Sequence, residues 1–241
     1  MERICDFHGH FLPGMDDGCK SPEESVQVLQ SSYRQGITKV FATSHYYPVE
    51  PVEAFLKRRE ESVAKLEEYI RQNGVEQIPQ ILLGAEVAYR PGISHQEDLE
   101  KLCLGSSRYL LLEMPFSRWG KGDVREVRNL CVNKNVTPIL AHIERYWDAQ
   151  DPNVMQSILQ EDVLVQMNAD TLLHMGIRRQ GCRLLKSGTV QLLGTDCHNM
   201  ERRAPKLGQA MDYLRKKKMD AAVQYVLTFS DQVYREACEE T

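Results

Sequence analysis

Short apolar runs recur along the chain, and longer stretches that mix polar and apolar residues separate them. Several runs are apolar over most of their length and rich in valine, isoleucine and leucine, which is typical of strands buried on both faces. The runs are ICDFH (4–8), ITKVFATS (37–44), QILLGAE (80–86), YLLLEM (109–114), VTPILAH (136–142), VLVQMNA (163–169) and VQLLGTD (190–196). The pattern therefore predicts seven buried strands.

Three of the intervening stretches carry helix signals. In SPEES (21–25), Ser21 stands at an N-cap, Pro22 at the first helical position and Glu24 where it would close a capping box. Gly36 follows where this helix should end. Residues 51–73 predict a long charged helix ended by Gly74, and residues 170–187 predict another ended by Gly188.

Strands that alternate with helices favour a parallel sheet with helical crossovers. Seven such units without a linker between them favour an α/β barrel similar to the TIM barrel, formed by a single domain over residues 1–241. A doubly wound open sheet is the alternative.

Composition narrows the class of protein. The chain has 30 basic and 34 acidic residues, a net charge of −4, which does not suggest nucleic acid or a membrane surface as a partner. We find no apolar window long enough to span a membrane and no signal-peptide pattern, so we expect a cytoplasmic protein. The seven cysteines contain no CxxC pair, which favours reduced thiols over disulfides or a cysteine zinc site.

Ionisable residues follow six of the seven runs. In an α/β barrel the carboxyl ends of the strands converge on one rim, so these side chains should meet there. His8 and His10 are two positions apart, as are Asp196 and His198, and residues so spaced on a strand point the same way. The candidate metal ligands are His8, His10, Asp17, His45, Glu86, Glu113, His142, Asp196 and His198.

Each residue taken alone has a simpler explanation. A single histidine at a strand end is more often structural, a single glutamate can pair with an arginine, and Asp16 or Asp17 before Gly18 is a common turn composition. Five histidines and four carboxylates at one rim would, however, repel and desolvate one another without a cation. Imidazoles with carboxylates suit zinc, manganese or iron, and nine ligands imply two or three ions.

Arginines near these ligands indicate the substrate. Arg145 lies three residues after His142, and Arg202 and Arg203 follow His198. Arginine beside a metal cluster is the expected group for binding a phosphate through paired hydrogen bonds, although either Arg202 or Arg203 alone could be a surface residue. Metal clusters that activate water also assist displacement at phosphorus.

Together, DFHGHFLPGMDDG, ATSH, GAEV, LLLEMPF, LAHIERY and GTDCHN followed by arginine resemble the polymerase and histidinol phosphatase (PHP) superfamily. The closest similarity is to its bacterial tyrosine-phosphatase branch, the CpsB/YwqE type of capsule and exopolysaccharide operons. It extends from residue 4 to about residue 206, and HIERY and the DDG after the HxH are its most specific parts.

The resemblance implies a distorted seven-stranded barrel and three divalent ions, with manganese preferred and iron or zinc as alternatives. It further implies hydrolysis of phosphotyrosine on the tail of a bacterial tyrosine kinase. By position, the nine residues above match the ligands, and Arg145 and Arg203 match the phosphate-binding arginines. Two departures could alter access or metal preference: SHY (44–46) replaces a more usual Pro-His-His, and Cys197 replaces an alanine.

Three alternatives remain at this stage. A thiol phosphatase would need a cysteine nucleophile followed by arginine, and only Cys197 with Arg203 has that spacing, but without glycine between them. A small-molecule phosphatase, such as one acting on histidinol phosphate, would use the same centre. A non-catalytic metal-dependent scaffold in polysaccharide export would cleave no phosphoester. An oligomer is possible under each of these alternatives.

Overall fold

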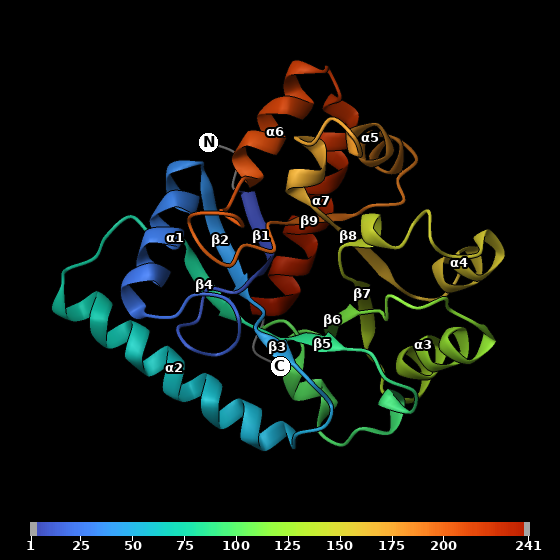
Figure 1. The fold of residues 1–241 in the computed structure, drawn as a ribbon, viewed down its shortest axis with the longest axis horizontal. Coiled ribbons are helices and arrows are strands. Elements are labelled where there is room, and N and C mark those ends of the chain that lie inside the picture. Colours follow the sequence, from blue (N-terminus) through green and yellow to red (C-terminus); the bar gives the residue numbers. More distant parts are fainter. Residues whose placement is uncertain (1–3, 239–241) are drawn as a thin grey trace.

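In the computed structural model, which describes residues 4–238, parallel strands form a curled half-barrel with helices around its outside (Figure 1). The strands are β1 (Ile4–Gly9), β2 (Ile37–Ala42), β3 (His45–Tyr46), β4 (Gln80–Leu83), β5 (Glu86–Ala88), β6 (Tyr109–Glu113), β7 (Thr137–Leu140), β8 (Leu164–Asn168) and β9 (Leu192–Gly194). The helices are α1 (Pro22–Arg34), α2 (Val52–Gln72), α3 (Lys121–Asn133), α4 (Pro152–Leu159), α5 (Arg178–Lys186), α6 (Leu207–Lys216) and α7 (Asp220–Cys238).

The strands divide into two parallel sheets. One has the order β1-β2-β4 and the other the order β3-β5-β6-β7-β8-β9. The first strand also meets the segment after the last one, because Asp196 N–H donates to the carbonyl of His8 (2.7 Å) and His10 N–H donates to that of Cys197 (2.9 Å). These bonds bring the two ends of the strand series together beside the candidate ligands.

Two predicted strands differ from the structure. The run 80–86, predicted as one strand, forms the edge strand β4 of the first sheet and the beginning of β5, which lies between β3 and β6 in the second, with a break at Gly84 and Ala85. A Cβ on Gly84 would lie 2.5 Å from the side chain of Leu104, so a larger residue there would have to displace this buried leucine. The run 37–44 is confirmed as β2 up to Ala42, and a separate short strand, β3, begins just beyond the run at His45.

The predicted helices are confirmed with one exception. Helix α1 begins after Ser21, whose hydroxyl accepts from Glu24 N–H (3.3 Å), but the Glu24 carboxylate accepts from Lys20 N–H rather than closing a capping box on Ser21. Helix α2 ends before Gly74, which has φ +56°. The helix expected over 170–187 was wrong in its first half: a 3₁₀ turn (Ala169–Leu172) precedes a loop with Gly176, and only α5 is α-helical.

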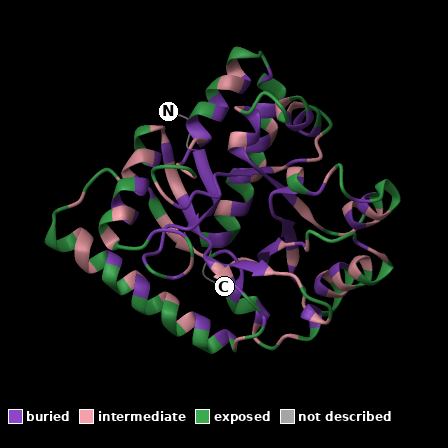
Figure 2. Cartoon of the chain, viewed as in Figure 1, coloured by how far each residue is buried: buried purple, intermediate pink, exposed green. Residues whose placement is uncertain are grey.

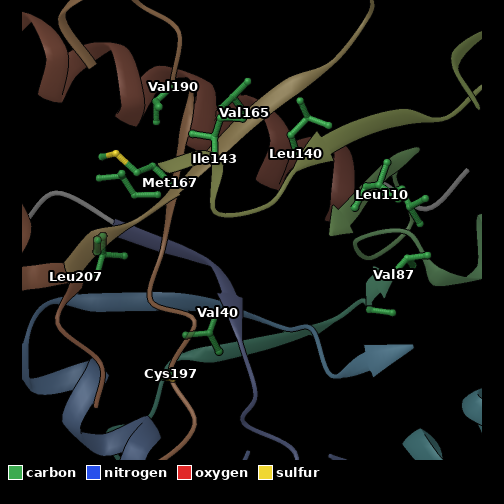
Figure 3. Close-up of a cluster of buried hydrophobic side chains, with 14 of the residues drawn as sticks. Val40, Val87, Leu110, Leu140, Ile143, Val165, Met167, Val190, Cys197 and Leu207 are labelled. Carbon is green, nitrogen blue, oxygen red and sulfur yellow. The ribbon is translucent and has the colours of Figure 1, made fainter. Parts of the chain in front are cut away.

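Most strands are buried on both faces, as their apolar runs predicted (Figure 2), but the edge strand β4 has no fully buried residue. On β6, Leu110 and Leu112 pack into a large cluster between the strands and the outer helices, part of which Figure 3 shows. Tyr109 and Leu111 face the opposite way, into a second cluster that includes Val233 of α7. Helix α7 packs against β1 and β9 (Figure 1), so it covers one side of the half-barrel. Among residues 4–238, no helix combines the length and apolar character needed to cross a membrane.

Candidate metal centre

All nine predicted ligands lie together at the carboxyl ends of the strands, around Glu86. Its Oε2 atom is 3.1 Å from His8 Nε2, 3.2 Å from His10 Nε2 and 3.1 Å from His45 Nδ1. Its Oε1 atom is 3.0 Å from His142 Nε2. Residues 8 and 142 are far apart in the sequence, so this assembly is a product of the parallel topology. One carboxylate therefore contacts four imidazoles.

Three groups of ligand atoms are each compact enough to hold one cation. Within each group the atoms lie no more than 4.8 Å from one another. The groups are His8, His10, Glu86 and Asp196; His45, Glu86 and Glu113; and His10, Asp17, His45 and His198. Glu86 belongs to two of them, so it would contribute to both sites if each group held a cation. His142 joins the same cluster through Glu86 and through Glu113 Oε1, which is 3.4 Å from its Nε2.

The inner atoms of this cluster have the properties expected of metal ligands. His8 Nε2, His10 Nε2, His45 Nδ1 and Glu86 Oε2 are all buried, and none makes a hydrogen bond. Buried polar atoms are normally satisfied, and leaving one unpaired costs about 1–3 kcal/mol. Four such atoms directed at one another fit divalent cations, which accept electron pairs from imidazole nitrogen and carboxylate oxygen.

Burial would favour the neutral form of Glu86 and so raise its pKa. Electrostatic attraction to His8 and the close imidazoles of His10 and His142 act more strongly, and they hold the pKa of Glu86 well below its usual range. The carboxylate is therefore ionised in the apo protein, ready to bind a cation.

The backbone is strained at two of these residues. His142 has φ +34° and Asp196 has φ +51°, a left-handed conformation that costs a residue other than glycine about 1–2 kcal/mol. Such strain persists where the surrounding structure requires it, and it is often found at active sites. At Asp196 the strained turn is held by the hydrogen bond from its N–H to the carbonyl of His8.

Two arginines border the cluster at Asp196. Arg203 Nη2 lies 2.5 Å from Asp196 Oδ1 and its Nη1 lies 2.8 Å from His198 Nε2. Arg145 donates to the other oxygen of Asp196. Both guanidinium groups are only about one-third exposed and line a cavity of about 310 Å³ beside the cluster. Arg202, by contrast, is exposed, and its backbone N–H donates to the side chain of Asn199.

Asp16 is a site residue that the sequence reasoning assigned only to a turn. Its Oδ2 accepts from His10 Nδ1 (2.7 Å) and from His45 N–H (2.9 Å), and its Oδ1 accepts from Gly18 N–H (2.9 Å). Burial raises the pKa of Asp16, but these bonds outweigh it and hold the pKa below its usual value. A carboxylate on the far nitrogen of a ligand histidine fixes the orientation of the ring. The DDG sequence thus supplies one residue to hold His10 and another, Asp17, to face the cluster.

Strand β8, which corresponds to the sixth predicted run, also contributes to the cluster, although that run ends without a candidate ligand. Gln166 Oε1 accepts from His142 N–H (2.7 Å) and lies 3.3 Å from His8 Nδ1. Gln166 donates to Asn168 (3.0 Å), which donates to Asp196 Oδ2 (3.0 Å). The two amides are two positions apart on β8, the same spacing that pairs His8 with His10. Together they connect three of the candidate ligands.

Aromatic side chains stand at the outer edge of the cluster. Tyr47 is 52% exposed and its ring stacks on that of His45 at 5.6 Å between centroids. Phe116 is 65% exposed and lies nearly parallel to the ring of His142, at 6.4 Å and 9°. Large apolar groups so exposed beside a buried polar centre suggest a surface for a ligand.

Cys197 is placed in the hydrophobic core. It is 1% exposed and belongs to the cluster of buried side chains in Figure 3, where it is labelled near Val40. Burial, with the charge of Asp6 nearby, raises the pKa of its thiol well above the usual value. Since the thiolate is the nucleophile, Cys197 is unsuited to attack a phosphate, and the thiol-phosphatase alternative loses its only candidate.

Comparison with known proteins agrees with this geometry. The model of the family described as "Capsular polysaccharide synthesis, CpsB/CapC" matches residues 4–232. The chain belongs to the CpsB/CapC family. The resemblance to CpsB/YwqE proteins in the sequence motifs is thereby confirmed.

Two relatives in this family are similar over almost their full length. Tyrosine-protein phosphatase CpsB of Streptococcus pneumoniae is 29% identical over 229 residues, which cover 89% of this chain and 90% of that protein. Tyrosine-protein phosphatase YwqE of Bacillus subtilis is 26% identical over 234 residues, covering 93% and 89%.

Solved structures support the fold. One from a study of YwqE and CpsB, which its authors call unique metal-dependent tyrosine phosphatases, superposes with a TM-score of 0.81 at 22% identity, covering 97% of this chain and 95% of that one. An organophosphorus hydrolase from Deinococcus radiodurans has a TM-score of 0.55 at 13% identity, covering 98% and 93%. The half-barrel thus belongs among TIM-barrel-like α/β folds.

Proposed function

We propose that this protein is a metal-dependent protein-tyrosine phosphatase that hydrolyses phosphotyrosine on a bacterial tyrosine kinase regulating capsule and exopolysaccharide synthesis. The observation that carries the proposal is the set of buried, unpaired ligand atoms around Glu86, bordered by Arg145 and Arg203. The names of the CpsB and YwqE relatives support the same activity.

The centre in this proposal contains three divalent ions, one for each compact group of ligand atoms. Manganese is our first assignment, with iron or zinc as alternatives, because imidazole and carboxylate ligands suit all three. The proposed ligands are His8, His10, Asp17, His45, Glu86, Glu113, His142, Asp196 and His198. When bound, such ions polarise the phosphoryl oxygens and provide a nucleophile from water at neutral pH.

The side chains around the ions have separate roles. Arg145 and Arg203 bind the phosphoryl oxygens and stabilise the charge that develops on them. Asp16 and Gln166 hold the ligand imidazoles in place. A phenolate leaving group, with a pKa of about 10 in its free form, needs less protonation than an alkoxide.

The exposed rings favour an aryl phosphate over an alkyl phosphate. Tyr47 and Phe116 flank the cluster through His45 and His142, so the ring of a phosphotyrosine can pack against them while its phosphate reaches the arginines. Histidinol phosphate, the substrate in the small-molecule alternative, places a flexible alkyl chain at that position.

The remaining assignments concern the chain as a whole. We propose one domain over residues 1–241, in which the two sheets together form a distorted seven-stranded barrel of the PHP type. We assign the protein to the cytoplasm, and we expect neither nucleic acid nor membrane insertion among its interactions, given the net charge of −4. An oligomer is compatible with these assignments.

The test compares two substrates with and without chelator. We expect the protein with Mn²⁺ to hydrolyse a phosphotyrosyl peptide much faster than histidinol phosphate, and excess chelator to abolish both activities. Full activity after long incubation in chelator would exclude the metal mechanism. Preference for histidinol phosphate would favour the small-molecule alternative, and no hydrolysis of either would favour a scaffold.

A further inference from the structure

A groove lined with positive charge lies between α5 and α6, outside the metal centre. It has a volume of about 640 Å³, and its lining includes Arg178, Arg179, Arg183, Lys186 and Lys217, together with Tyr213 and Cys182. No acidic residue lines it. Within residues 4–238, none of these five cations forms an ion pair. The groove is therefore a concentrated patch of positive charge on a protein whose net charge is −4.

The ring of Tyr213 holds two of these cations in place. Tyr213 lies between the two helices, with the guanidinium of Arg178 and the ammonium of Lys217 each 5.8 Å from its ring centroid. These contacts fix one cation from α5 and place another at the end of α6. Arg179 and Arg183 are exposed and four residues apart, so they lie on the same face of α5.

The helices that line the groove begin at the cavity of the candidate active site, and Ile177 of that cavity is followed directly by Arg178 of the groove. Ile177 and Lys206 line the cavity that contains Arg145 and Arg203, and these two residues immediately precede α5 and α6. From Lys206 to Lys217, at about 1.5 Å per helical residue, the groove reaches about 16 Å from the cavity. That length corresponds to about five residues of extended chain. A peptide whose phosphotyrosine occupies the cavity can therefore extend over the cations.

We infer that this groove is a docking surface for an anionic segment of the phosphoprotein substrate, next to the phosphotyrosine that is hydrolysed. The inference rests on the proposed phosphatase function. The chemistry that the cations recognise is a negative group, either the carboxylates of acidic residues or further phosphates on the same segment. Charge complementarity of this kind acts mainly on the rate of association and on selection among substrates.

The experiment uses charge reversal on the exposed face of α5. The variant Arg179→Glu/Arg183→Glu is compared with Lys57→Glu/Lys65→Glu on α2, where both lysines are exposed and the net charge changes equally. Each protein is loaded with Mn²⁺ and tested on p-nitrophenyl phosphate and on three phosphotyrosyl peptides of equal length. In the first peptide the five residues on each side of the phosphotyrosine are glutamine, and in the second they are glutamate. The third peptide has glutamines with phosphoserine among them.

We expect the α5 variant to lose about tenfold in kcat/KM on the anionic peptides, with less dependence on salt, and to change less than twofold on p-nitrophenyl phosphate. The α2 variant should match the parent on every substrate. A loss on the glutamate peptide alone, or on the phosphoserine peptide alone, identifies which anion is recognised.

Several results would overturn the inference. They are equal losses in the α2 variant, no difference between the anionic and glutamine peptides, or unchanged peptide kinetics with lost binding to vesicles of anionic phosphatidylglycerol. The last result would assign the groove to a membrane surface. If the parent protein hydrolyses none of the substrates, the proposed function has failed instead, so the two failures are distinguishable.

Discussion

Arg145 and Arg203 differ from the ligands in what their removal should change. Alanine at either position should lower kcat/KM by about 10²–10³, because a guanidinium stabilises the charge that develops on the phosphoryl oxygens. Metal content should stay at the parent value, since neither residue is a proposed ligand. Lysine at Arg145 should rescue only in part, because it keeps the charge but not the planar pair of donors.

Metal analysis and phosphotyrosyl-peptide kinetics on the same preparations check this expectation. His142→Ala is the matched control, since it lies three residues from Arg145 but should lose metal together with activity. Near-parental kcat/KM in both alanine variants would show that the arginines do not bind the phosphate.

The exposed ring of Phe116 should select for the aryl group of the substrate. We expect Phe116→Ala to lower kcat/KM for a phosphotyrosyl peptide by about three- to tenfold, or roughly 0.7–1.4 kcal/mol, the range for an aromatic pair. Turnover of a phosphoseryl peptide, which lacks the ring, should not change. Val132→Ala, a second exposed apolar residue, on α3, should affect neither substrate. Equal losses on both peptides would mean that Phe116 acts on the centre rather than on the ring.

Strand β8 is the element whose role in the centre can be tested without altering a ligand. Gln166→Ala should weaken metal affinity by about 10–100-fold, because His8 and the backbone of His142 lose the oxygen that holds them. Gln166→Glu keeps that acceptor and should lose less. Metal titration of the apo variants measures the effect, with exposed Gln156→Ala on α4 as the control. Unchanged metal affinity in Gln166→Ala would show that this glutamine does not orient the ligands and serves only in packing.

Most strands could be predicted because a strand buried on both faces appears in the sequence as a short run of apolar residues. The run ends also indicated the candidate ligands that the structure brings together, since strand ends converge in any parallel half-barrel. The end of β2 at Ala42 and the break after Leu83 could not be predicted in this way. At Gly84 the chain closely approaches the side chain of Leu104, a contact that an apolar run does not reveal.

Residues that support the ligands were harder to recognise. Asp16 has the composition of a turn, and only the folded loop brings it to His10 and His45. Gln166 and Asn168 could have been noticed, because they are two amides two positions apart at the end of a strand. Amides are not preferred ligands of these metals, however, so the pattern did not indicate a role. The groove between α5 and α6 depends on how two helices pack, which the spacing of charges along one helix does not reveal.

For the molecule as a whole, the centre should contribute stability as well as chemistry. A ligand present at 100 times its Kd stabilises the folded state by about 2.7 kcal/mol. For a domain of this size, that should correspond to a rise in Tm of about 5–10 °C. We therefore expect chelator to lower Tm by this amount and Mn²⁺ to restore it, as followed by calorimetry.

The control for this shift is Glu86→Gln, which removes the carboxylate shared by two of the three ligand groups. Its Tm should respond less to chelator and to Mn²⁺ than that of the parent protein. A parent protein that loses activity in chelator without any change in Tm would mean that the ions bind the folded and unfolded chains equally well.

The meeting of β1 with the segment after β9 has a consequence for how the protein is made. His8 and His10 leave the ribosome early, but Asp196, His198 and Arg203 follow about 10–40 s later at about 5–20 residues per second. A nascent chain can therefore hold no complete centre. An ion bound early would meet only part of the proposed ligands, so we expect the choice of metal to be made after synthesis, by the ions available to the finished fold.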